Sequence, residues 1–194
     1  LVLFLILLLA TNLVVTRRHL EFLFEGLFVE SASVGIIAGV QFVSRYHATR
    51  IAHPRDLYRL MAFEERVQGL MGHWMNFSGQ QMLILSALLA FIVLRPATRK
   101  TWSVAFAVIA CSVLLSLTRG VWVGCFMAGI YIIGSWKPRW LLVIPILIAV
   151  AYVRAPYLLR ERVNMAMHPA ADVAVSIRLQ MWQVGLRMIR AHPW

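Results

Sequence analysis

The feature that most constrains this chain is a long apolar run with one charge near its centre. The run extends from Thr101 to Ser135, and Arg119 is the one formally charged residue among its 35 residues. A single helix of that length would measure about 52 Å, whereas the hydrocarbon core of a bilayer is about 30 Å thick. The run therefore predicts two helices that meet at Thr118-Arg119-Gly120. Such a hairpin would place Arg119 at or near a membrane surface.

The composition extends this reading to the whole chain. Of the 194 residues, 61% are hydrophobic and 14% are charged, and the mean hydropathy is +0.75. Near-uncharged segments recur along the sequence, which predicts an all-α, polytopic transmembrane helical bundle with about six spans. The predicted spans are about 1–16, 26–43, 76–94, 101–117, 121–135 and 140–153.

We treat residues 1–194 as a single membrane domain. The chain begins without methionine inside an apolar run, so we expect an internal fragment of a longer protein. Within the second predicted span, Gly35 and Gly39 have the spacing that suits close helix packing. Glu30 in the same span lies either near the membrane surface or toward the bundle interior.

The basic residues divide unevenly between the connections. Three short connections, 17–18, 95–100 and 137–139, hold 7 Lys or Arg residues, and the positive-inside tendency assigns them to the cytoplasm. The outward connections, 44–74, 118–120 and 154–194, then carry 12 arginines and no lysine. Either this orientation is inverted, or the arginines bind an anionic ligand such as a diphosphate, whose oxygens match the planar guanidinium. Nucleic acid is not an expected partner, because the basic residues flank membrane spans.

Two outward segments have an amphipathic helical pattern, His53 to Gly72 and Ser176 to Arg190. Both would lie at the membrane interface on the extracytoplasmic side or cover a cavity. Arg178 belongs to the second segment, and its simplest role is on a solvated helix face.

A few residues are candidates for chemistry. Arg119 is either a ligand-binding cation or a side chain that reaches to the headgroups, and Thr118 beside it binds phosphate or its own helix backbone. His73, at the start of the third predicted span, is either a proton acceptor or an interfacial side chain beside Trp74. The same helix end carries two further polar candidates, Asn76 and Gln80. No metal-ligand spacing and no phosphate-binding glycine loop occurs, so neither a metal nor a cofactor is expected.

Three stretches resemble the O-antigen ligase and polymerase family of bacterial envelope polysaccharide assembly. SLTRGVWVG (residues 116–124) resembles the family's Ser-x-(Ser/Thr)-Arg-Gly-x-Trp-x-(Gly/Ala) signature. SIRLQMWQVGLRMIRAHPW (176–194) resembles its Arg-x-x-x-Trp stretch followed by His-Pro, and GHWMNFSGQQM (72–82) resembles a looser upstream pattern.

The resemblance implies a multi-pass glycosyltransferase of the bacterial inner membrane with its active face toward the periplasm. It would move a glycan from an undecaprenyl diphosphate carrier to lipid A core or to another glycan, without a metal. Arg119, Arg178 and Thr118 would hold the diphosphate, and His73, Asn76 and Gln80 would be secondary contacts. The family's key histidine lies beyond the His-Pro, so the catalytic base is expected after Trp194 and the fragment alone would be inactive.

Two other classes fit part of the pattern. A transporter or lipid flippase for an anionic substrate would also need intramembrane polar residues, although no inverted repeat is evident. A structural membrane subunit would use the arginines to bind anionic lipid headgroups. An Arg119→Lys exchange separates these classes, because lipid attraction survives it and bidentate diphosphate binding does not.

Overall fold

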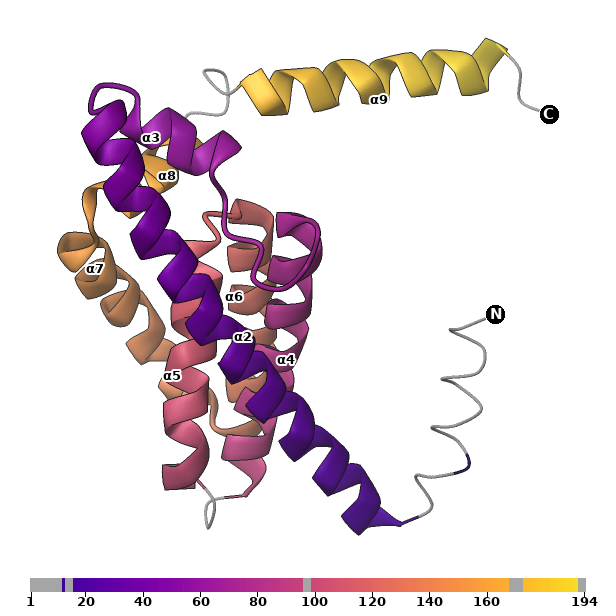
Figure 1. The fold of residues 1–194 in the computed structure, drawn as a ribbon. Helices are drawn as coiled ribbons and strands as arrows, with labels where there is room; N and C mark the ends of the chain where they lie inside the picture. The colour runs from indigo at the N-terminus through magenta and orange to yellow at the C-terminus, as the bar shows by residue number, and fades with distance from the viewer. Residues whose placement is uncertain (1–11, 13–15, 96–98, 168–172, 192–194) are drawn as a thin grey trace. The chain divides into compact units, whose positions relative to one another are not determined.

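The protein is helical throughout its described parts. The computed structural model describes residues 12, 16–95, 99–167 and 173–191, and every regular element in them is a helix (Figure 1). The expected all-α class is confirmed. The residues form two compact units, Leu1–Ile144 and Pro145–Trp194, each described here by itself. The single membrane domain stays a prediction.

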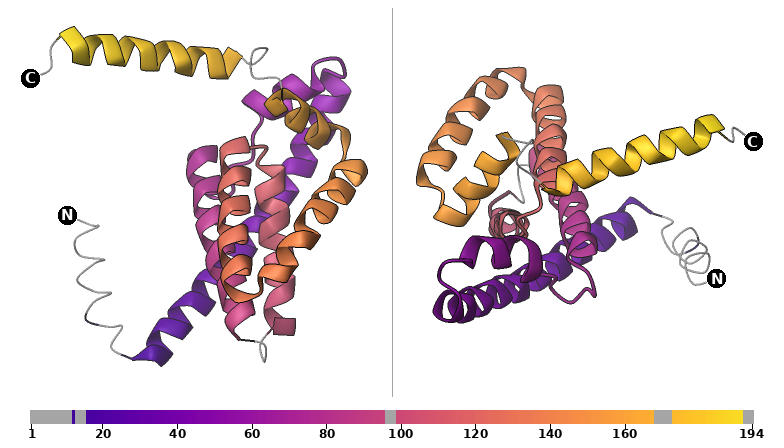
Figure 2. Two further views of the ribbon diagram at one scale, coloured as in Figure 1. Left: turned by 180° about the vertical axis from the view of Figure 1, so that it is seen from behind. Right: turned by 90° about the horizontal axis from the view of Figure 1, so that it is seen from above.

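Among the described residues of the first unit, the four longest helices alternate in direction. They are α2 (Arg17–Ala52), α4 (Trp74–Leu94), α5 (Arg99–Leu115) and α6 (Arg119–Trp136). α2 contacts α4 and α5, and α4 also packs against α5 and α6 (Figures 1 and 2). We call the end where α2 and α5 begin and α4 and α6 end the basic end. The opposite end, which holds the α5–α6 turn, is the Arg119 end.

An aromatic cluster ties three helices together toward the basic end. Phe28 of α2 is 1% exposed, and its ring centroid lies 5.5 Å from that of Phe91 in α4 and 5.4 Å from that of Trp102 in α5. Both contacts are edge-to-face, the arrangement that aromatic quadrupoles favour. At the same end Arg95 forms an ion pair with Glu21, and this hydrogen bond raises the pKa of Arg95. The three short basic connections therefore meet at one end of the bundle.

Close helix packing occurs at one of the two glycines predicted for it. A Cβ on Gly35 would lie 3.4 Å from the Ser112 side chain, so α2 and α5 approach closely there. A Cβ on Gly39 would meet nothing within 4 Å. The neighbouring Ala38 is fully buried and takes the place in the core that the sequence assigned to Gly39.

The predicted number of six spans is wrong. In the described part of the chain, two helices, α2 and α4, are long and apolar enough to cross a membrane, and 100–115 is a shorter apolar helix. Helices of 17 and 18 residues, as in α5 and α6, extend about 26 Å, less than the hydrocarbon thickness. The hairpin turn at 116–118 causes this shortness. The span predicted at 1–16 lies almost wholly outside the described residues.

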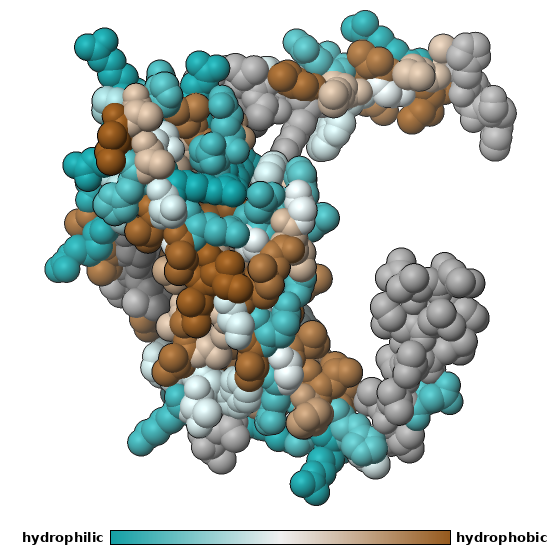
Figure 3. Space-filling view, in the orientation of Figure 1, coloured by the Kyte–Doolittle hydropathy of each residue, from teal (hydrophilic) through white to brown (hydrophobic). Residues whose placement is uncertain are grey.

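The span predicted at 140–153 is broken. A 3-10 helix, η3 (Pro138–Val143), precedes α7 (Ile144–Arg154), which has 11 residues. Pro145 lacks the backbone N–H that would continue an α-helix through this point. Figure 3 shows hydrophobic side chains gathered over the middle of α2 and α4, with hydrophilic ones toward both ends of the bundle.

The outward segment 44–74 is not one loop followed by one amphipathic helix. α2 continues through Ala52, and only α3 (Leu57–Arg59) and a π-helix, η1 (Leu60–Glu64), follow it. From Glu65 to His73 the chain is irregular. The helix predicted over 53–72 therefore ends at Glu64. The residues after Glu64 contact α2 in a way that a helical backbone would not allow.

In the second unit, the residues that the structure describes form three helices. After α7 come α8 (Tyr157–Met167) and α9 (Val173–Ala191). The Tyr152 hydroxyl donates a 2.9 Å hydrogen bond to Oδ1 of Asn164, which joins α7 to α8. Helix α9 covers the segment 176–190 that the sequence predicted to be helical, whereas α8 was not predicted.

Candidate functional site

The turn between α5 and α6 is buried and fully determined by local contacts. Ser116 and Leu117 are 0% and 1% exposed. The Ser116 hydroxyl donates to the carbonyl oxygen of Val113 at 2.7 Å, and the Thr118 hydroxyl donates to that of Ser116 at 3.0 Å. The predicted hairpin is therefore present, with its reversal at residues 116–118.

Leu117 adopts a conformation that leucine rarely takes. Its φ is 51°, in the left-handed region, where a non-glycine residue costs roughly 1–3 kcal/mol. The buried side chain offsets this cost, because releasing the strain would expose it to solvent. Strained residues held in this way concentrate at functional sites.

Trp122 fixes the turn from the α6 side. Its indole Nε1 donates a 3.0 Å hydrogen bond to the carbonyl oxygen of Val113, in the last turn of α5. That carbonyl has lost its partner in the helix ladder, as the last four carbonyls of any helix do. The tryptophan of SLTRGVWVG thus closes the hairpin as a structural clamp.

Arg119 is the first residue of α6 and is half-buried. Thr118 is the N-cap residue, but its side chain makes no capping hydrogen bond and donates instead to Ser116. The first N–H groups of a helix point out along the axis and carry partial positive charge. Arg119 and the α6 N-terminus are therefore both at the Arg119 end, and a cation beside a helix N-terminus favours an anion.

The two glycines of the signature differ in their surroundings. A Cβ on Gly124 would lie 2.3 Å from Sδ of Met82, so this glycine permits the close contact between α6 and α4. A Cβ on Gly120 would meet nothing within 4 Å. Packing therefore explains Gly124 and does not explain Gly120.

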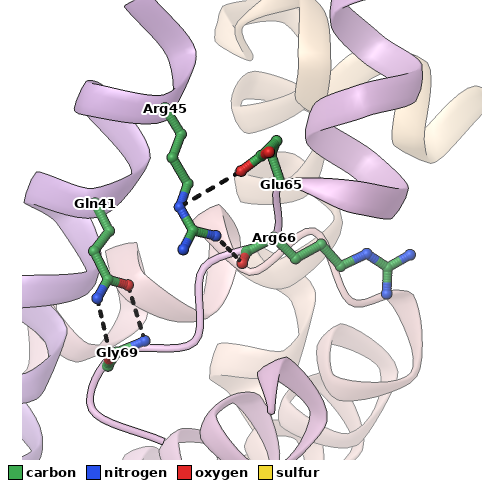
Figure 4. Close-up of polar contacts among 5 residues, drawn as sticks. All are labelled: Gln41, Arg45, Glu65, Arg66 and Gly69. Carbon is green, nitrogen blue, oxygen red and sulfur yellow. Dashed lines mark hydrogen bonds and ion pairs between the residues drawn. The ribbon is translucent and has the colours of Figure 1, made fainter. Parts of the chain in front are cut away.

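The irregular segment after η1 is bound to α2 by paired contacts (Figure 4). The Gln41 side chain donates from Nε2 to the carbonyl oxygen of Gly69 at 2.8 Å and accepts at Oε1 from its N–H at 3.1 Å. Arg45 donates to the carbonyl oxygen of Arg66 at 2.6 Å, and its Nε lies 3.7 Å from Glu65. Irregular backbone in a membrane protein needs such partners, because lipid supplies none.

Two of the outward arginines therefore have structural roles. Arg45 holds the loop, and Arg66 donates to the carbonyl oxygen of Ala62. The Arg66 guanidinium also lies 3.9 Å from the centre of the Trp74 ring, a cation–π distance. Arg45 and Arg66 are among the 12 outward arginines, so not all of these arginines are available to bind a ligand.

His73 caps a helix. Its Nδ1 accepts a 3.1 Å hydrogen bond from the N–H of Met75, which makes His73 the N-cap of α4. Its ring lies beside Trp74, with centroids 5.2 Å apart. Asn76 is exposed in the first turn of the same helix. Both residues lie at the Arg119 end, and their roles toward a substrate stay predictions.

Gln80 faces α2. Its Nε2 donates a 3.3 Å hydrogen bond to Glu30, whose carboxylate also accepts from Ser31 at 3.4 Å. Met82, two residues later and so about 200° around the helix, contacts Gly124 of α6. Gln80 and α6 therefore lie on opposite sides of α4, and the structure does not bring Gln80 together with Arg119.

Gln81, which follows Gln80 in sequence and was the alternative to it as an inward-facing polar residue, is buried. It is 2% exposed, and its Nε2 donates a 3.1 Å hydrogen bond to the carbonyl oxygen of Ser31. Its Oε1 has no hydrogen-bond partner in the described part of the chain.

Arg178 lies in the second turn of α9, in the second unit. Its convergence with Arg119 stays a prediction. Among the residues that the structure describes, no group of three His, Cys, Asp or Glu side chains is placed to hold a metal ion.

One protein-family model matches part of this chain. Residues 104–194, just under half of the sequence, match the family model described as O-antigen ligase. No match was found among curated proteins or among solved structures. The matched segment contains SLTRGVWVG and SIRLQMWQVGLRMIR, whereas GHWMNFSGQQM precedes it. By this match, residues 104–194 of the chain are similar to the O-antigen ligase family, whose members are membrane proteins.

Proposed function

We propose that the chain is part of a membrane glycosyltransferase that moves a glycan from undecaprenyl diphosphate to an acceptor. The acceptor is lipid A core in a ligase and a second glycan in a polymerase. The enzyme would lie in the bacterial inner membrane with the Arg119 end toward the periplasm. The family match supports the class of activity, and the geometry around Arg119 supports the donor.

The observation that carries the proposal is the rigid turn in front of α6. Buried Ser116 and Leu117 and the Trp122 hydrogen bond hold the α6 N-terminus in place. The Arg119 guanidinium and the first N–H groups of α6 then offer positive charge on one side. A diphosphate suits this arrangement, because its oxygens accept both kinds of donor.

The open space at Gly120 leaves room for such a phosphate. No neighbour within 4 Å requires a glycine there. Close approach of a phosphate to the helix N-terminus does require one, because a Cβ would stand between the phosphate and the backbone.

In the proposed reaction an acceptor hydroxyl oxygen forms a bond to the anomeric carbon of the donor glycan. The bond between that carbon and the phosphate oxygen breaks, and the diphosphate leaves with the electron pair. The hydroxyl proton passes to a base outside the residues assigned here. Arg119, with Arg178 as the proposed second cation, stabilises the charge on the leaving diphosphate.

The test is complementation of a deletion strain with the full-length gene. Surface glycan on lipid A core and glycan chain length would be scored separately, which distinguishes ligase from polymerase. We expect Arg119→Ala to lower glycan transfer about 10²-fold, as for the loss of one charge-stabilising donor. Arg119→Lys should keep only part of the activity, because lysine offers no bidentate fork.

Arg55→Ala is the matched control, because Arg55 is exposed on the segment after α2 and its loss lowers the net charge equally. It should retain glycan transfer. Wild-type glycan from the Arg119→Ala variant, at equal protein level in the membrane, would contradict the proposed diphosphate role.

A further inference from the structure

An apolar pocket opens at the basic end of the bundle, far along α6 from Arg119. Its volume is about 450 Å³, and it lies between the last turns of α4, the last turn of α6 and η3. The lining side chains are all apolar or aromatic, and they are Leu89, Ile92, Val93, Leu94, Ile133, Trp136 and Trp140. Sites for small ligands have volumes of about 300–1,000 Å³. The pocket is therefore large enough for part of a hydrocarbon chain.

Three cations are adjacent in sequence to residues that line this pocket. Each of three lining residues has a basic neighbour in sequence: Leu94 precedes Arg95, Trp136 precedes Lys137, and Trp140 follows Arg139. The Lys137 ammonium lies 4.6 Å from the centre of the Trp136 ring, so it stands at the pocket rim.

The three cations near the pocket differ in whether an acidic side chain neutralises them. Arg95 forms its ion pair with Glu21. Lys137 and Arg139 are exposed, and neither has an acidic partner in the described residues. The rim is therefore positive where η3 begins.

We infer that this pocket binds one acyl chain of an anionic phospholipid, with the phosphate of its headgroup between Lys137 and Arg139. Basic residues beside a gap between transmembrane helices recognise anionic headgroups, and tryptophan favours the headgroup level. A zwitterionic lipid could fill the pocket but would gain little from the two cations.

The polyprenyl carrier is a different occupant. Its diphosphate is proposed to lie at Arg119, and the 18 residues of α6 separate that point from Trp136 by about 26 Å. The lipid site is thus distinct from the proposed donor site, and either can fail without the other.

Quenching by brominated lipids tests the inference in the full-length protein. The protein would be placed in nanodiscs of phosphatidylcholine with increasing amounts of phosphatidylglycerol brominated in its acyl chains. The contribution of the two pocket tryptophans is the part of the quenching that disappears in the double variant Trp136→Phe, Trp140→Phe. We expect half-quenching at roughly tenfold less brominated phosphatidylglycerol than brominated phosphatidylcholine.

Two charge variants separate the pocket from general attraction. Lys137→Gln with Arg139→Gln should abolish the preference for phosphatidylglycerol, and both side chains are exposed, so the fold should persist. Arg17→Gln with Arg18→Gln removes the same charge at the same end and should keep the preference.

Three results would overturn the inference. Equal quenching by the two lipids would show that the pocket does not select an anionic headgroup. An equal loss of preference in both double variants would indicate a diffuse electrostatic effect. Displacement of brominated phosphatidylglycerol by an equimolar amount of polyprenyl phosphate would assign the pocket to the carrier.

Discussion

The indole Nε1 of Trp122 donates a 3.0 Å hydrogen bond to the carbonyl oxygen of Val113, across the turn between α5 and α6. This contact joins the first turn of one helix to the last turn of the other. It gives the tryptophan of SLTRGVWVG a structural role, whereas the role of Arg119 toward a ligand stays a prediction.

Replacement of Trp122 by phenylalanine tests the clamp. Most of the apolar contact would remain, and one hydrogen bond would be lost, at a cost of about 1 kcal/mol. Thermal unfolding of the full-length protein in detergent would measure the change, and glycan transfer should fall because the turn loosens. Trp102→Phe is the control, since Trp102 contributes ring contacts to the aromatic cluster. A Trp122→Phe variant that transfers glycan at the wild-type rate would show that the hydrogen bond does not position Arg119.

Gly120→Ala separates packing from ligand approach. The added methyl meets no neighbour, and alanine is about 1 kcal/mol more favourable than glycine within a helix, so the melting temperature should stay or rise. Glycan transfer should nevertheless fall, because the methyl would obstruct a phosphate at the α6 N-terminus. Gly129→Ala, in the same helix and equally open, is the control and should leave transfer unchanged. If both variants transferred glycan normally, no ligand would approach the backbone at Gly120.

Gly69→Ala should damage the loop that Gln41 holds. The φ of Gly69 is 58°, and a Cβ there would lie 2.8 Å from Val34 and 2.9 Å from Phe77. Both neighbours belong to a buried cluster, so we expect a loss of at least about 2 kcal/mol in the free energy of unfolding. Gly72→Ala, with open space around it, should unfold like the wild type. Limited proteolysis within 65–73 provides the second measurement, and equal resistance of the two variants would contradict the expectation.

The sequence predicts the helical class and the hairpin because both depend on local properties. Apolar runs of 15 or more residues form helices both in water-soluble proteins and in membranes. A run of 35 residues with Arg119 inside it is too long for one membrane-spanning helix and is expected to fold back on itself. That arithmetic placed the turn at 118–120, whereas the structure has it at 116–118, with Arg119 as the first residue of α6. The number of spans was wrong because the estimate counted apolar length, whereas the turn at 116–118 makes α5 and α6 short and the segment 140–153 is broken near Pro145.

The loop at 65–73 and the partners of the arginines could not be predicted in the same way. Gln41 and Gly69 are 28 residues apart, and nothing in the local pattern near either residue indicates the other. The same limit applies to Arg45 and Arg66, whose charges suggested a ligand while their hydrogen bonds serve the loop. Arg119 could be selected as a candidate because the turn at 116–118 and the start of α6, which surround it, are adjacent to it in sequence.

Gln81→Leu tests whether the buried amide of α4 is a cost or a function. Its Oε1 has no partner among the described residues, and a buried polar group left unsatisfied costs about 1–3 kcal/mol. Leucine has a similar volume and would remove that cost while giving up one hydrogen bond to Ser31, so the variant should melt at the same or a higher temperature. Gln80→Leu, which breaks the exposed contact with Glu30, provides the comparison and should change the free energy of unfolding by less than about 1 kcal/mol. A destabilisation by Gln81→Leu clearly larger than the roughly 1 kcal/mol of the hydrogen bond to Ser31 would mean that Oε1 accepts a hydrogen bond from a bound water or a ligand.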